Sequence, residues 1–295
     1  MLCKDGMRME EVVRELEIPV PGRSPVRADL RTCASRAEAP LVIACHGFLG
    51  YKRWGFFPYL SGRLAEAGFH VLTMSFSLNG VDEETGRFNR PDDFARNTVS
   101  AEIADLRGVC SFVRSGALAL AGAPVRRWGL FGHSRGGAAA ILVSREFEEV
   151  RSIVTWSTPA RLDRYTARRK VQWKKDGALV FADDRSPVPL RLDFAYYEDI
   201  DAHRSDFDLP RAAGALTIAH LMVHGERDGA VTLAEARALA AAPRGGGARL
   251  EIIRGAGHTF NVRHPMRRPT PALERSVRLT TEWFTDTLGV TREER

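Results

Sequence analysis

A serine between two glycines is the first group in this sequence that could do chemistry. It lies in Gly132-His133-Ser134-Arg135-Gly136, directly after an apolar run and directly before an alanine-rich segment. A strand, a sharp turn and a helix in that order hold a serine exposed on a strained backbone, in the arrangement called a nucleophile elbow. The flanking glycines are needed because strand and helix pass so closely that a Cβ atom would clash. We therefore predict that Ser134 is a catalytic nucleophile.

A serine hydroxyl is unreactive until a base takes its proton. His258, in Gly257-His258-Thr259, is the predicted base, and Asp228 is the predicted acid that fixes its tautomer and stabilises the imidazolium. The order serine, aspartate, histidine is the nucleophile, acid and base order of one large class of α/β enzymes. Two backbone amides, those of Phe48 and Arg135, are predicted to hold the oxyanion that forms when a carbonyl is attacked.

Other side chains compete for these roles. His264 is close in sequence to His258 and is the main rival base, whereas Asp163, after the preceding predicted strand, is the rival acid. His46 and His224 precede glycines at strand ends, where tying loops together is favoured over proton transfer.

Alternating strands and helices must position these groups. A continuous apolar run, as at residues 41–45, is typical of a strand covered on both faces, and apolar residues at steps of three and four, as from Ala95 to Val113, indicate a helix. The predicted strands are the elbow strand and residues 11–20, 26–33, 41–45, 69–76, 150–156, 217–224 and 249–254. The predicted helices are residues 58–67, one capped by Asp92 or Asp93, the helix after Ser134, one opened by a capping box at 232–235, and 271–288.

These elements predict a mostly parallel sheet with helices on both faces. In such sheets the active site forms at the carboxyl ends of the strands. The loops that hold His46-Gly47-Phe48, Ser134, Asp228 and His258 all follow predicted strands. We therefore expect them to meet at one edge of the sheet.

Residues 157–214 interrupt this alternation. The segment is charged and contains four prolines, and its roughly 55 residues are too many for a simple connection, so we expect an inserted cap. Between residues 161 and 176 it holds seven basic and two acidic residues, with Leu162, Tyr165 and Trp173 at roughly helical spacing. Trp173 is the expected apolar wall for substrate. A solvated helix face and a rim that attracts anionic substrates are the two interpretations of the basic residues.

Composition limits the function classes. The 295 residues are 44% hydrophobic, with a net charge of +6 from 43 basic and 37 acidic residues, and no nucleic-acid-binding motif appears. Residues 1–11 are charged and no 18-residue apolar run occurs, so a soluble cytoplasmic protein is expected. Cys3, Cys33, Cys45 and Cys110 have no metal-ligand spacing and are expected to be reduced, mostly buried thiols.

The chain resembles α/β-hydrolases of the dienelactone-hydrolase, prolyl-oligopeptidase-like and cinnamoyl-esterase-like group. The resemblance rests on four segments in the right order: His46-Gly47-Phe48, the Ser134 elbow, His224-Gly225-Glu226-Arg227-Asp228 and Gly255-Ala256-Gly257-His258. It implies an α/β-hydrolase fold over residues 1–295 with an eight-stranded sheet, hydrolysis of a carboxylic ester or amide, and no cofactor. Dienelactone hydrolases proper use a cysteine nucleophile, which Ser134 replaces here.

The expected partner is therefore a small-molecule ester, with neither nucleic acid, membrane nor metal, and a homodimer is left open. A serine esterase is favoured over a peptidase or amidase because only about 40 residues precede the first of the four segments, too few for a propeller-type domain. A thioesterase and a non-catalytic binding protein on the same fold are the further alternatives.

Overall fold

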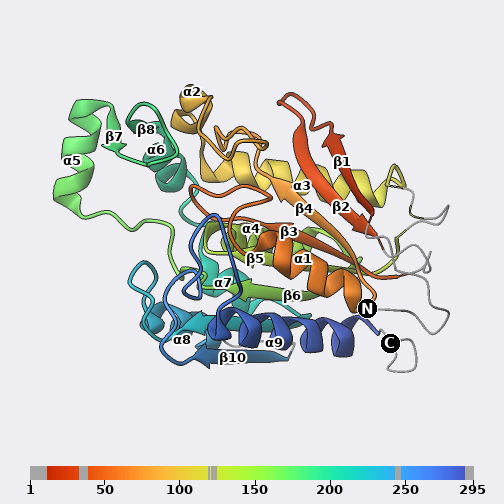
Figure 1. Cartoon of the computed structure of the whole chain (residues 1–295). Helices are drawn as coiled ribbons and strands as arrows, with labels where there is room; N and C mark the ends of the chain where they lie inside the picture. Colours follow the sequence, from red (N-terminus) through yellow and green to blue (C-terminus); the bar gives the residue numbers. More distant parts are fainter. Residues whose placement is uncertain (1–11, 33–38, 119, 121–124, 243–246, 290–295) are drawn as a thin grey trace.

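The computed structural model describes residues 12–32, 39–118, 120, 125–242 and 247–289. Eight strands form one sheet in the order β1-β2-β4-β3-β5-β6-β9-β10 (Figure 1). The β1–β2 and β2–β4 pairs are antiparallel and the other five pairs are parallel. The strands are β1 Val12–Ile18, β2 Val26–Thr32, β3 Leu41–Cys45, β4 His70–Ser75, β5 Trp128–His133, β6 Val150–Trp156, β9 Ala219–Gly225 and β10 Ala248–Ile253. This is the predicted α/β-hydrolase fold.

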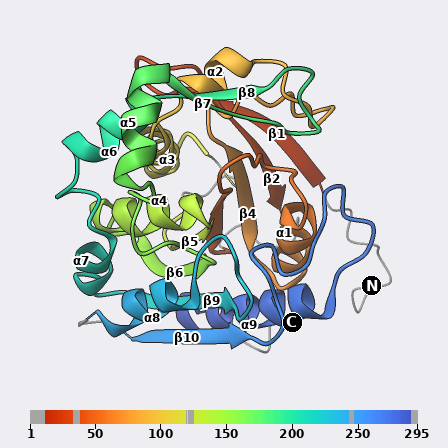
Figure 2. The same ribbon diagram turned by 90° about the vertical axis from the view of Figure 1, so that its left-hand side faces the viewer.

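Helices cover both faces of the sheet (Figure 2). Helices α1 and α9 pack on one face, and α3, α4, α7 and α8 on the other. Their bounds are α1 Phe57–Glu66, α3 Val99–Arg114, α4 Arg135–Val143, α7 Leu209–Gly214, α8 Leu233–Ala241 and α9 Pro271–Leu288, with a short 3-10 turn at Ser144–Glu146. Strands β3, β4 and β5 are buried along their whole length, as expected for strands covered on both faces.

The helix predicted to be capped by Asp92 or Asp93 is formed as two separate helices. The apolar stripe that begins at Ala95 is divided between α2 (Pro91–Ala95) and α3, and the side chain of Thr98 caps α3 by accepting a hydrogen bond from the Ala101 amide. Asp92 and Asp93 lie in the first turn of α2, where their charges favour the helix N-terminus, and neither is its N-cap. The capping box before α8, by contrast, is present as predicted, with Thr232 and Glu235.

The segment between β6 and β9 carries its own small elements. Helix α5 (Ala167–Asp176) leads into the antiparallel hairpin of β7 (Ala178–Phe181) and β8 (Leu190–Asp193), and α6 (Ala195–Ala202) and α7 follow. The excursion, as we call residues 157–214, projects past one end of the sheet except for α7, which packs against α4 and α8, and its hairpin packs on α2 (Figures 1 and 2). Its first residue is tied to the sheet, because the Ser157 amide donates to the Val223 carbonyl at 2.9 Å.

Two of the four cysteines can be compared with expectation. Cys45 and Cys110 are free and buried, and burial raises the pKa of both thiols. Cys3 and Cys33 lie outside the described residues. Across the described ranges, none of the helices combines the length and the apolarity needed to cross a bilayer.

Candidate active site

The nucleophile elbow is formed at the junction of β5 and α4. Ser134 has φ 54° and ψ −122°, a conformation that costs a non-glycine residue on the order of 1–3 kcal/mol. The Ser134 amide donates to the Trp156 carbonyl at 2.8 Å, which fixes the turn to β6. A Cβ atom on Gly132 would lie 2.4 Å from the Gly136 carbonyl oxygen. Gly132 is therefore required by the close passage of β5 and α4, whereas Gly136 is required because α4 passes close to the end of β3.

The three side chains predicted to act together do meet. The Ser134 Oγ lies 3.1 Å from His258 Nε2, and His258 Nδ1 lies 2.8 Å from Asp228 Oδ2. With the imidazole proton on Nδ1, the histidine donates to the carboxylate and its Nε2 accepts from the serine. These residues follow β5, β9 and β10, three strands that run parallel to one another in the same sheet.

The carboxylate of Asp228 is held rigidly. Its Oδ1 accepts hydrogen bonds from the amides of Ala230 and Val231 at 2.9 and 2.8 Å. Burial raises the pKa of Asp228, but the hydrogen bond from His258 and the two amides outweigh burial and keep the pKa below its usual value. Asp228 is therefore an anion aimed at the imidazole at neutral pH.

The rival residues are engaged elsewhere. Asp163 pairs with Lys170 at 2.5 Å. His264 accepts from the Gly55 amide at 3.0 Å and contacts the Tyr51 hydroxyl at 3.2 Å. Within the described residues, His264 makes no hydrogen bond to Ser134 and Asp163 makes none to a histidine, so the structure favours His258 and Asp228 by position.

His46 and His224 tie loops together. His46 donates from Nδ1 to the Gly47 carbonyl and accepts at Nε2 from the Phe76 amide. Burial lowers the pKa of His46 to about 4, so the ring is neutral. His224 donates from Nε2 to the Val231 carbonyl at 3.0 Å.

The two amides predicted to form the oxyanion hole come from touching segments. A Cβ on Gly136 would lie 2.4 Å from the His46 carbonyl oxygen, and one on Gly47 would lie 2.8 Å from Ser134 Cβ. Within the described part of the chain, the backbone N–H groups of Phe48 and Arg135 donate no hydrogen bond. Two free N–H groups beside the serine are what an oxyanion hole requires.

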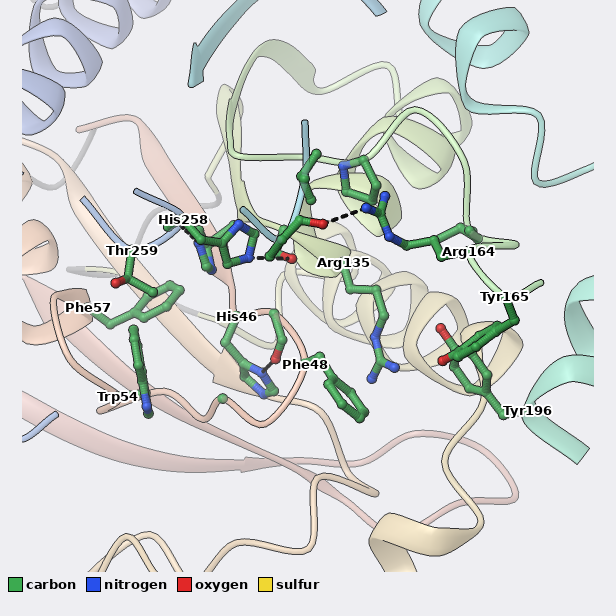
Figure 3. Close-up of a pocket in the computed structure, with 18 residues that line it drawn as sticks. His46, Phe48, Trp54, Phe57, Arg135, Arg164, Tyr165, Tyr196, His258 and Thr259 are labelled. Atoms are coloured by element: carbon green, nitrogen blue, oxygen red, sulfur yellow. Dashed lines mark hydrogen bonds between the residues drawn. The ribbon is translucent and has the colours of Figure 1, made fainter. Parts of the chain in front are cut away.

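A cavity of about 310 Å³ opens over Ser134. Trp54, Phe57 and Thr259 line one end, and Phe48, Arg135, Tyr165 and Tyr196 line the other (Figure 3). Its remaining lining residues are His46, Gly47, Gly50, His133, Pro159, Leu162, Arg164, Ala230, Val231 and His258.

Trp173 is not a wall of this cavity, in contrast to our expectation. Its side chain is fully buried and donates to the Leu192 carbonyl at 2.9 Å. Helix α5 begins only at Ala167, so the helical spacing assumed from Leu162 does not exist, and Trp173 turns inward beneath Tyr165 and Tyr196. The tryptophan supports the two tyrosines that do line the cavity.

A buried ion pair beside the nucleophile was missed in the sequence. The Arg135 guanidinium pairs with Glu102 of α3, whose Oε1 also accepts from Asn97 Nδ2 at 2.9 Å. The guanidinium also lies 4.6 Å from the centre of the Phe48 ring. The available signal was the spacing of Glu102, three residues after Val99, which places a carboxylate on the buried face of an apolar helix.

His133 is a second group that the sequence did not single out. Its Nε2 donates to the His258 carbonyl at 3.0 Å, which joins the elbow strand to the loop of the base. Burial and the neighbouring His258 lower the pKa of His133 to about 3. Within the described ranges, no cluster of three or more His, Cys, Asp or Glu side chains is placed to hold a metal ion.

Comparison with known proteins identifies the family. Residues 42–270 match the model of the alpha/beta hydrolase family. This chain belongs to the alpha/beta hydrolase family. No protein of curated function matches the sequence of this hydrolase.

Solved structures agree with the fold of this hydrolase. Est1E from Butyrivibrio proteoclasticus with ferulic acid bound has a TM-score of 0.72 at 20% identity, over 92% of this chain and 98% of that one. A hydrolase of Agrobacterium vitis has a TM-score of 0.70 at 17% identity, over 92% of this chain and 98% of that one. A dienelactone hydrolase of Anabaena variabilis has a TM-score of 0.61 at 18% identity, over 95% of this chain and 99% of that one. At such identities these likenesses establish the fold alone.

Proposed function

We propose that this hydrolase cleaves a small carboxylic ester through an acyl-enzyme on Ser134. The observation that carries the proposal is the hydrogen-bonded series Ser134, His258, Asp228 at the floor of an open cavity. A cavity of about 310 Å³ is at the small end of the usual range for small-molecule sites.

In the first half of the reaction, His258 Nε2 takes the proton of Ser134 as Oγ attacks the ester carbonyl. The amides of Phe48 and Arg135 donate to the resulting oxyanion. The tetrahedral intermediate then collapses, His258 gives the proton to the leaving alcohol, and the acyl group stays on Ser134.

In the second half, water replaces the alcohol. His258 takes a proton from water, the hydroxide attacks the acyl carbon, and Ser134 leaves with the proton returned from Nε2. Asp228 stays ionised throughout and stabilises the imidazolium in both halves.

The test is a panel of p-nitrophenyl esters of increasing acyl length, with methyl ferulate because one similar structure holds ferulic acid. Aminoacyl anilides and an acyl thioester run beside them. We expect the esters to be turned over fastest. Faster cleavage of the anilides or the thioester would instead make the protein an amidase or a thioesterase on the same site.

Ser134→Ala decides whether the site is catalytic. We expect kcat to fall by at least about 10⁴-fold with the fold intact, because the nucleophile is lost. A fluorophosphonate probe should label the wild type at Ser134 and leave the variant unlabelled. Absence of both turnover and labelling in the wild type would favour a binding protein, and labelling of a different serine would overturn the assignment.

A further inference from the structure

The loop that supplies the Phe48 amide has a backbone that its own residues disfavour. The Gly50 amide donates to the Gly47 carbonyl at 3.1 Å and closes a four-residue turn. Leu49, the third residue of this turn, has φ 60°. Glycine or asparagine usually occupies such a position, because a leucine Cβ crowds the backbone there. Something outside the turn must therefore hold it.

Arg185, from the β7–β8 hairpin of the excursion, reaches this turn. Its Nη2 donates to the Leu49 carbonyl at 2.8 Å, across 136 residues of sequence. Leu49 directly follows the residue whose amide faces the oxyanion. The contact therefore fixes the carbonyl of the strained residue.

The guanidinium of Arg185 is itself locked. Asp183 accepts from Nε and Nη2, both at 2.9 Å, and the guanidinium carbon lies 4.9 Å from the centre of the Phe88 ring. The Phe88 amide donates to the Arg185 carbonyl at 3.0 Å. A planar group held by two parallel hydrogen bonds and a ring loses little freedom when it binds a third partner.

The same hairpin contacts the side chain of Phe48. The Phe181 ring at the end of β7 lies 5.7 Å from the Phe48 ring, and Phe94 of α2 lies 5.4 Å from it. Arg135, the other predicted amide donor, stacks on this ring. The hairpin thus holds the loop at two adjacent residues.

We propose that Arg185 is a positioning residue that sets the oxyanion-hole loop, so that the excursion contributes to the rate of the chemical step as well as to substrate choice. The inference rests on the proposed esterase function. Since the oxyanion forms only during attack, loss of Arg185 lowers kcat and leaves the KM of a small ester nearly unchanged.

The experiment compares Arg185→Gln with Arg191→Gln, a matched change on the same hairpin at an exposed arginine. Among the described residues, Arg191 forms one ion pair, a loose 3.7 Å contact with Asp193. For p-nitrophenyl acetate we expect Arg185→Gln to lower kcat about 10–30-fold with KM within twofold, and Arg191→Gln to change neither. A trifluoromethyl ketone, which forms an oxyanion on Ser134, should lose affinity for Arg185→Gln in proportion to kcat/KM. The product acid should bind Arg185→Gln as tightly as it binds the wild type.

Two further variants separate positioning from damage. The double variant Asp183→Asn, Arg185→Gln leaves no unpaired carboxylate and should show the same loss of kcat. Arg185→Lys keeps one donor and should recover part or all of the rate, and the double variant carries the test if Arg185→Gln does not fold. Unchanged kcat in Arg185→Gln or in the double variant, or a loss confined to KM, would overturn the inference. Failure of the proposed function is distinguished by the wild type and Ser134→Ala, because either the wild type would then lack ester turnover or Ser134→Ala would retain it.

Discussion

The two sides of the active site are built differently. On the sheet side, Ser134 and Asp228 are held by backbone hydrogen bonds and Ser134 by glycines whose neighbours leave no room for a Cβ atom, and the His258 carbonyl is held by the His133 ring. On the excursion side, Tyr165 and Tyr196 are held by side chains, chiefly by the buried Trp173, which Tyr165 meets edge to face and on which Tyr196 stacks.

We infer from this difference that the sheet side carries out the proposed reaction and that the excursion side selects the substrate. Backbone contacts fix the groups that would react in the proposed acyl transfer, which tolerates errors of only about 0.5 Å, whereas a side-chain wall can be repacked without moving them. Substitutions on the sheet side should lower kcat, and those on the excursion side should change KM, with Arg185 as the proposed exception.

The largest effect on the sheet side after loss of Ser134 is expected for Asp228→Asn. We expect kcat to fall about 10³–10⁴-fold with KM little changed, because an amide favours the wrong imidazole tautomer. Asp163→Asn on the excursion is the control and should remain within a few-fold of wild type in steady-state assays. A large loss of kcat in Asp163→Asn together with a small loss in Asp228→Asn would show that the acid lies on the excursion. The proposed difference between the two sides of the site would then be wrong.

A backbone change in the oxyanion loop comes next. Gly47→Val should cost about 3 kcal/mol of transition-state stabilisation, about 100-fold in kcat/KM, because its Cβ would lie 2.8 Å from that of Ser134 and displace the Phe48 amide. Phe48→Leu keeps the amide and should retain at least about a fifth of the activity. Equal tolerance of both changes would show that this loop does not form the hole.

The buried histidines of the sheet side predict a dependence of stability on pH. In the folded protein the pKa is about 4 for His46 and about 3 for His133, both below the ordinary value of 6.5. Between pH 6.5 and pH 5, these two histidines therefore take up protons almost only in the unfolded chain. The free energy of unfolding should therefore drop by roughly 2 kcal/mol per histidine between pH 7 and pH 5. Urea titrations at both pH values measure the drop, and His46→Gln should reduce it. A drop that His46→Gln leaves unchanged would contradict this account.

The smallest effect is expected at the basic residues of the excursion. Arg164 lines the cavity, and the described residues that line the cavity include no Asp or Glu. Arg168 is exposed to solvent on α5. We expect Arg164→Gln to lower kcat/KM for an anionic ester about threefold relative to a matched neutral ester, at low salt only, and Arg168→Gln to have no effect. Indifference of both variants to substrate charge and salt would leave these arginines as solvated surface.

Prediction from sequence succeeded where backbone rules apply. The fold follows from apolar periodicity, and the meeting of Ser134, Asp228 and His258 follows from their places after parallel strands. Trp173 and the start of α5 were misjudged because a charged, weakly periodic segment gives no register. Arg185 and Glu102 could not be paired with their partners, since a contact across 136 or 33 residues leaves no local pattern.

The hydrogen bond from Ser157 to Val223 bears on how this protein could be altered. It continues the β6–β9 ladder one residue past β6, so the excursion leaves the sheet beside the end of β9, whereas the chain returns at Ala219, opposite Ser152, at the other end of these parallel strands. An exchange of this segment between relatives therefore has to include a crossover from one end of the sheet to the other. A graft between Ser157 and Ala219 would keep Ser134, Asp228 and His258 but remove the contact to Leu49. Recombination, natural or designed, therefore has to carry a substitute for Arg185 along with the new substrate wall.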